Sequence, residues 1–178
     1  MKSTLKIIIF ALLSIAMMAC GEKKITQDDL KKAEATLFNE NQTMNEDAAP
    51  GVAETYEKFV SQSPDDPTAP TWLFHAMEIN IQLKNTDKSI ALGNQLLEQY
   101  PDSKWAPRTL FFLGNYVYDE QLHDLDKARE AYERLINDYP DSEFVEDAQK
   151  SIEYLGLTPE EILSKIMMSK MEEEEGEL

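Results

Sequence analysis

A repeated segment constrains the fold of this chain more than any other feature. Tyr100-Pro101-Asp102-Ser103 recurs as Tyr139-Pro140-Asp141-Ser142, a shift of 39 residues. Under the same shift Trp105 matches Phe144. A weaker copy lies 37 residues upstream, where Pro64-Asp65 matches the Pro-Asp of the middle copy. Self-similarity with a period of this length predicts a stacked array of one supersecondary unit.

Each repeated unit has the pattern of two helices. Residues 126–138 place apolar side chains at helical spacing, and Pro140 prevents the helix from continuing. The following helix is expected to stop at Gly156, a favourable left-handed cap. Segment 104–122 is longer and carries Gly114 in its middle, a weak position for helix formation. We therefore expect a neighbouring helix to pack closely against Gly114.

The N-terminus has the pattern of a secretory signal peptide over residues 1–19. Lys2 and Lys6 precede an apolar run at 7–16, which is shorter than the ~20 residues of a membrane-spanning helix. A small residue, Ala19, then stands before Cys20, the only cysteine. A basic start, an apolar middle and a small residue at the end are typical of exported proteins.

The position of Cys20 resembles the lipobox of bacterial lipoproteins, although Met17 and Met18 depart from its usual residues. The resemblance implies that Cys20 becomes lipidated and that residues 20–25 form a tether. It also implies the outer membrane, because Gly21 is not the Asp that signals inner-membrane retention. Two alternatives remain, an ordinary signal peptide followed by a free thiol and a retained membrane anchor. Exposure to the periplasm or to the exterior stays open.

The repeats resemble the tetratricopeptide repeat (TPR), through Gly114, Ala128, Tyr132 and Pro140. The spacing from Gly114 to Ala128 is two residues longer than usual. Long repeats ending in Tyr-Pro-Asp-Ser resemble the TPR lipoprotein of the β-barrel assembly machine and the Tol-Pal-associated cell-division coordinator. With the lipobox, the chain resembles small TPR outer-membrane lipoproteins of Bacteroidetes. The resemblance implies an all-α, antiparallel helix-pair solenoid over 26–156, with about three units and a final helix.

The C-terminal part is expected to form a helix over 157–171 and a disordered acidic tail over 172–178. Thr158-Pro159-Glu160-Glu161 combines an N-cap, a proline at the first helical position and a capping-box Glu. The helix has one apolar face, and an open solenoid end needs a cap, so we predict a C-terminal capping helix. The alternative is a Met-rich docking helix for a partner. The like charges of Glu172–Glu175 favour disorder.

Composition and motifs give no support for catalysis. The chain has two histidines and no HExxH, GxSxG, P-loop or GxGxxG motif. We therefore predict that the protein is not an enzyme and uses no cofactor or metal. The net charge of −17 repels phosphate backbones, which argues against nucleic-acid binding. The charge favours partners with a basic surface, or it serves solubility alone.

The resemblance also implies which residues contact a partner, because the first helix of each TPR unit lines a concave groove. The expected groove residues are His75, Asn80, Arg108, Phe111, Asn115 and Tyr118. The expected function is a non-catalytic scaffold for protein–protein interaction in the cell envelope, in outer-membrane protein assembly, cell division or wall remodelling. The alternative is a lipoprotein that binds a glycan or a peptide on exposed aromatic side chains such as Trp72 or Trp105.

Overall fold

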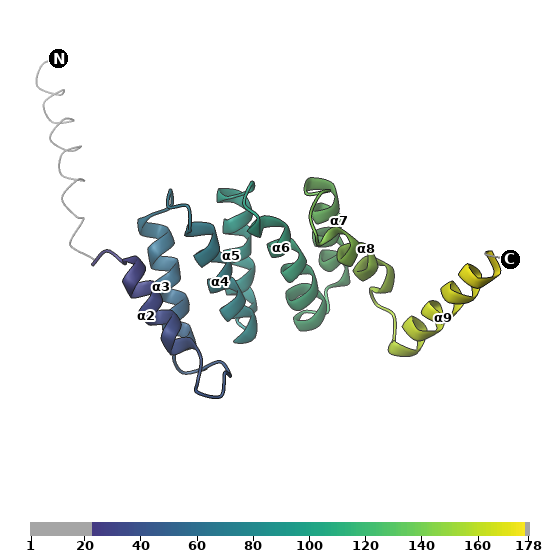
Figure 1. Cartoon of the computed structure of the whole chain (residues 1–178), viewed down its shortest axis with the longest axis horizontal. Helices are drawn as coiled ribbons and strands as arrows, with labels where there is room; N and C mark the ends of the chain where they lie inside the picture. The colour runs from purple at the N-terminus through teal and green to yellow at the C-terminus, as the bar shows by residue number, and fades with distance from the viewer. Residues whose placement is uncertain (1–22, 177–178) are drawn as a thin grey trace, which may run out of the picture.

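A computed structural model describes residues 23–176. Cys20 and the expected signal peptide lie outside the described residues. The described chain is a row of helices, with α2 near one end and α9 at the other (Figure 1). The elements are α2 (Gln27–Leu37), α3 (Ala49–Gln62), α4 (Ala69–Gln82), α5 (Thr86–Gln99), α6 (Trp105–Phe112), the π-helix η2 (Leu113–Gln121), α7 (Leu125–Asp138), α8 (Val145–Tyr154) and α9 (Pro159–Gly176).

The helices form antiparallel pairs that stack in chain order, which confirms the predicted all-α helical-repeat solenoid. The pairs are α2 with α3, α4 with α5, and the continuous α6–η2 with α7, and α8 follows them. One core runs through the stack because each helix buries one face against its neighbours. The largest fully buried side chains include Tyr56, Phe74, Met77, Leu113 and Tyr132.

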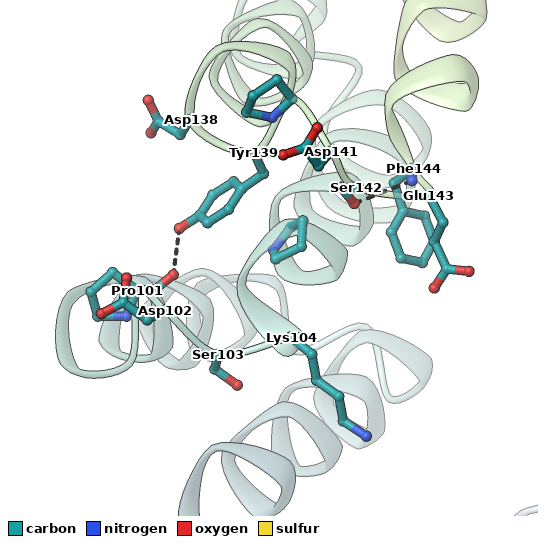
Figure 2. Close-up of a pocket in the computed structure, with 12 residues that line it drawn as sticks. Pro101, Asp102, Ser103, Lys104, Asp138, Tyr139, Asp141, Ser142, Glu143 and Phe144 are labelled. Carbon is teal, nitrogen blue, oxygen red and sulfur yellow. Dashed lines mark hydrogen bonds between the residues drawn. The ribbon is translucent and has the colours of Figure 1, made fainter.

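The repeated Tyr-Pro-Asp-Ser sequence forms the same turn twice and connects consecutive units. The Ser103 hydroxyl accepts a hydrogen bond from the Trp105 amide, and Ser142 does the same for Phe144, both at 3.2 Å. Figure 2 shows the second turn lying against the first, with Tyr139 reaching the Pro101 carbonyl. The motif thus begins the next helix and fixes its place on the unit before.

The π-helix η2 explains the long spacing in the third unit. Its wider turns accommodate the two extra residues between Gly114 and Ala128 without breaking the helix. Gly114 then lies so close to Tyr132 that a Cβ there would stand 2.7 Å from the ring atom Cε1. The expected close packing at Gly114 is confirmed. In the second unit the glycine is on the other helix of the pair: Gly93 of the second helix, α5, packs against Met77 of the first helix, α4.

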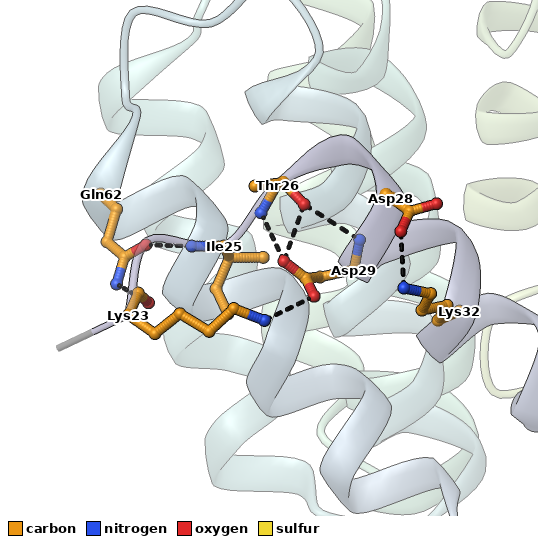
Figure 3. Close-up of polar contacts among 7 residues, drawn as sticks. All are labelled: Lys23, Ile25, Thr26, Asp28, Asp29, Lys32 and Gln62. Atoms are coloured by element: carbon orange, nitrogen blue, oxygen red, sulfur yellow. Dashed lines mark hydrogen bonds and ion pairs between the residues drawn. The ribbon is translucent and has the colours of Figure 1, made fainter.

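The first helix is fixed at its N-terminus by a capping box and by the segment before it (Figure 3). The Thr26 hydroxyl accepts from the Asp29 amide while the Asp29 carboxylate accepts from the Thr26 amide. The Gln62 side chain accepts from the Ile25 amide at 2.7 Å and so ties α3 to this segment. Pro50 and Gly51 lie in the first turn of α3, where the missing amide of proline costs little.

Helix α9 has the predicted start. Thr158 and Glu161 form the expected reciprocal hydrogen bonds. Beyond its first turns, however, the helix extends away from the stack (Figure 1). Ile162 and Ile166 are half-buried, but four other large apolar side chains are more than half exposed: Leu163, Met167, Met168 and Met171. The predicted C-terminal helix is present, and only its first turns lie against α8. Residues 172–176, expected to be disordered, are helical, and 177–178 lie outside the described residues.

Candidate functional site: an aromatic strip around Arg108

A strip of rings crosses the first helices of successive units. Phe74 of α4 stacks on Trp105 of α6 with ring centroids 4.6 Å apart, and its edge meets Phe112 at 5.3 Å. His75 lies 5.4 Å from Trp105. We call this set the aromatic strip; its members are Trp72, Phe74, His75, Trp105, Phe112 and Phe144. Phe74 is fully buried and the others are half-buried.

Polar atoms of the strip are satisfied within the fold. The indole nitrogen of Trp72 donates to Thr68 at 3.1 Å, and that of Trp105 donates to Thr71 at 2.9 Å. The second bond joins α6 to α4, so it also fixes the spacing between two units. The rings are therefore held in place before any partner arrives, which lowers the entropic cost of binding.

Arg108 lies at the centre of the strip. Its guanidinium carbon Cζ is 5.4–5.9 Å from the centroids of four rings, those of Phe74, Trp105, Phe112 and Phe144. Distances of this size allow attraction between a cation and the ring faces. Lys104 places a second cation 5.1 Å from the Trp105 ring. The strip therefore combines apolar area with positive charge.

Two predicted groove residues of α4 have different roles. His75 belongs to the aromatic strip, and its Nδ1 lies 2.7 Å from a carboxylate oxygen of Glu78. Asn80 is buried, donates to the Ala76 carbonyl at 2.8 Å and accepts from the Asn85 side chain at 3.2 Å. The prediction of Asn80 as a contact residue is wrong, because both hydrogen bonds serve the end of α4.

The structure separates the other predicted residues into two cavities. Phe111 and Asn115 line a cavity of about 680 Å³ formed with α8 and the start of α9. Tyr118 lines a different cavity of about 220 Å³, together with residues of α5 and α7. The prediction assumed α-helical spacing from Arg108 to Tyr118. The π-helix changes that spacing, so Asp119 rather than Tyr118 shares the cavity with Asn115.

Burial changes the ionisation of the tyrosines around these cavities. Desolvation raises the pKa of Tyr132 to about 12 and raises that of Tyr118 above its ordinary value. For Tyr118 the nearby Lys127 acts in the opposite direction. These hydroxyls stay protonated at neutral pH and provide no charge for acid–base chemistry.

Most of the aromatic strip is absent from the contact residues expected from the sequence. Trp72 and Trp105 enter there only as a surface for a glycan or a peptide, and Phe112 and Phe144 have no expected contact role. One usable signal was present, because Trp105 and Phe144 occupy the same position in consecutive repeats. Aromatic residues repeated at the start of first helices are expected to meet when the units stack.

The described residues show no feature of a membrane span or a metal centre. Between residues 23 and 176, no helix is both long and apolar enough to cross a bilayer. No group of three or more His, Cys, Asp or Glu in that range could hold a metal ion. A cavity of about 580 Å³ between the two Tyr-Pro-Asp-Ser turns is lined by prolines and acidic side chains (Figure 2).

Comparison with known proteins agrees with this architecture. The family described as tetratricopeptide repeat matches residues 73–103 and 116–142. The first match covers most of α4, all of α5 and the turn after it, and the second runs from η2 to the turn after α7. No curated protein and no solved structure matches the chain. Repeats of this family typically bind proteins. The chain thus contains tetratricopeptide repeats, arranged in an all-α helical-repeat solenoid.

Proposed function

We propose that this protein is a non-catalytic scaffold of the bacterial cell envelope, anchored by a lipid on Cys20, that binds a protein segment along the aromatic strip. The carrying observation is the strip itself, which runs over α4 and α6 to the start of α8. The lipobox resemblance of Cys20 supports the anchor, with the outer membrane as its location. The acidic surface favours partners that are basic outside the contact.

The geometry of the two tryptophans favours a protein partner over a glycan. Sugar rings stack on flat, open aromatic faces. Trp105 instead has Phe74 stacked against it at an interplanar angle of 24° and two cations beside it. Trp72 is packed 4.8 Å from Tyr56. A surface of ring edges and methylene groups suits side chains of a peptide better.

The experiment is photo-crosslinking in intact cells, followed by mass spectrometry of the membrane fraction. A photoreactive amino acid replaces Phe112 in the aromatic strip, and a matched copy carries it at Glu98 on the exposed side of α5. The proposal expects one reproducible protein adduct from position 112 and none of the same mass from position 98. Equal adducts at both positions, or none at position 112, would contradict it.

The anchor is tested separately with Cys20→Ser. We expect the unchanged chain to fractionate with outer membranes after high-salt washing and the variant to lose that association. One diacyl or triacyl group gives durable attachment, whereas a surface contact is salt-sensitive. Membrane association that survives the substitution would contradict lipidation at Cys20 and leave the binding proposal standing.

A further inference from the structure

Arg108 differs from the other cations of this acidic chain in the number of rings around it, because four rings lie near its guanidinium and Lys104, Lys127 and Lys165 each lie near one. Lys127, Arg134 and Lys150 each pair with a carboxylate three or four residues away in the sequence. Arg108 makes no hydrogen bond or ion pair within residues 23–176, although the sequence has 34 acidic residues. Its neighbours are aromatic rings instead.

The guanidinium has a buried side and an accessible side. The Nε atom is buried and has no hydrogen-bond partner, which identifies the side that faces the protein. The two terminal nitrogens are not among the buried unpaired atoms, so solvent or a ligand can reach them. Rings that hold the plane of a guanidinium leave its outer edge free for a bidentate partner.

The chemistry of this edge selects a carboxylate. Two parallel N–H donors match the two oxygens of a carboxylate, and such charge-assisted pairs are shorter and stronger than neutral hydrogen bonds. The surrounding rings keep water away from part of the site, and a lower local dielectric strengthens the pairing. A bound carboxylate would also neutralise a charge that the fold itself leaves unpaired.

On the basis of the proposed function, we propose that Arg108 is the anchor of the partner site and pairs end-on with one Asp or Glu side chain of the bound protein segment. Apolar side chains next to that residue pack on the aromatic strip. The rest of the segment is neutral or basic, because carboxylates dominate the surface outside the strip. The partner therefore has one acidic residue within an apolar and otherwise uncharged or basic segment.

The test is a selection from a randomised peptide library displayed on phage, with the full chain in detergent as the target. We expect acidic residues to be enriched at one position among peptides selected on the unchanged protein. The enrichment is expected to disappear on Arg108→Gln. It should persist on Arg129→Gln, a matched change at an exposed position of α7.

A selected peptide is then compared with its Glu→Gln copy by tryptophan fluorescence, since Trp105 lies beside Arg108. The Gln copy should bind the unchanged protein about tenfold or more weakly, because one charge-assisted pair is lost. On Arg108→Gln the two peptides should bind almost equally. Arg108→Lys keeps the charge without the bidentate edge and should give an intermediate ratio.

Two results would overturn the inference in distinguishable ways. Selected peptides that show no acidic preference, or the same preference on Arg108→Gln, would remove the role of Arg108 and leave the scaffold proposal intact. A library that yields no strip-dependent binder would contradict both. Circular dichroism of each variant shows that a lost preference does not come from unfolding.

Discussion

The hydroxyl of Tyr139 donates a 3.0 Å hydrogen bond to the carbonyl of Pro101, one repeat earlier in the chain (Figure 2). Tyr100 makes the same bond to Pro64 at 2.9 Å. Each tyrosine ends the second helix of one unit, and each proline lies in the turn that ends the second helix before it. The Tyr-Pro pair in the sequence is thus a connection between neighbouring units, in addition to a helix stop.

Removing these hydroxyls should weaken the coupling between units. Tyr100→Phe and Tyr139→Phe are each expected to lower the free energy of unfolding by about 1 kcal/mol, the usual net value of such a bond. Urea denaturation followed by circular dichroism measures the change. Tyr116→Phe is the control, because the structure gives this half-buried hydroxyl no hydrogen bond among the described residues. Equal effects at all three positions would contradict the assigned role.

The close contact at Gly114 predicts opposite results for two glycines. Gly114→Ala places a methyl group 2.7 Å from the buried Tyr132 ring, so overpacking should cost about 1–3 kcal/mol, partly offset by better helix propensity. Gly51→Ala, in the first turn of α3, meets no atom within 4 Å and should stabilise by about 0.5–1 kcal/mol. Thermal unfolding of both variants checks the signs. A stabilising Gly114→Ala would exclude the packing described.

The sequence was sufficient for those parts of the fold that depend on local rules and on the repeat. Gly156 adopts the expected left-handed conformation, with φ of 80°, and Thr158 forms the expected capping box with Glu161. Both follow from the preferences of single residues within a few positions. The helix pairing followed from the period alone.

The site was harder to predict because it depends on the rotation of residues around a helix. A two-residue excess before Ala128 was visible, but whether a loop or a π-helix absorbs it depends on packing against α7. That choice places Tyr118 in a different cavity from Asn115. The surroundings of Arg108 come from three consecutive units, so no local pattern could identify them.

Alkaline pH should reveal the burial of Tyr56 and Tyr132. Desolvation raises the pKa of each to about 12 in the folded protein, against 10.0 for an ordinary tyrosine. Above pH 10 the unfolded chain releases these protons first, so the folded state loses stability as pH rises from 10 to 12. The loss is about 1.4 kcal/mol per pH unit for each group within that window. Urea titrations at several pH values measure it.

The variant Tyr132→Phe separates the contribution of Tyr132 to this alkaline loss of stability from that of Tyr56. The variant should reduce the slope between pH 10 and 12 by the share of Tyr132, about 1.4 kcal/mol per pH unit, while Tyr56 and the less strongly raised Tyr100, Tyr118 and Tyr139 keep theirs. At pH 7 it should change the free energy of unfolding by less than about 1 kcal/mol, since the buried Tyr132 hydroxyl has Ser151 nearby but makes no hydrogen bond of ordinary length and angle. A slope that is unchanged, or a large loss at pH 7, would show that this hydroxyl is solvated or bonded.

Two first helices end at non-glycine residues in the left-handed region. Lys84 has φ of 56° after α4, and His123, 39 residues later, has φ of 53° after η2. Such a conformation costs a residue with a side chain about 1 kcal/mol or more relative to glycine. Lys84→Gly and His123→Gly should each raise the melting temperature of the chain. Gln121→Gly, two residues before the second cap and inside η2, should lower it.

Helix α9 should contribute little to the stability of the solenoid. Most of its large apolar side chains are exposed and only Ile162 and Ile166 are half-buried. Its described polar links to α8 are those of Lys165 to the carbonyl and carboxylate of Glu153. Exposed ion pairs contribute little, typically below about 1 kcal/mol. A stop codon after Leu157 should therefore change the free energy of unfolding by less than about 1 kcal/mol, as measured by urea denaturation. A loss of several kcal/mol would mean that α9 folds back as a cap in solution, because an uncovered solenoid end exposes core residues.

Met167→Ala tests the same point within the full chain. The substitution should be nearly neutral if the helix stands free, whereas truncating a buried Met would cost about 2–5 kcal/mol.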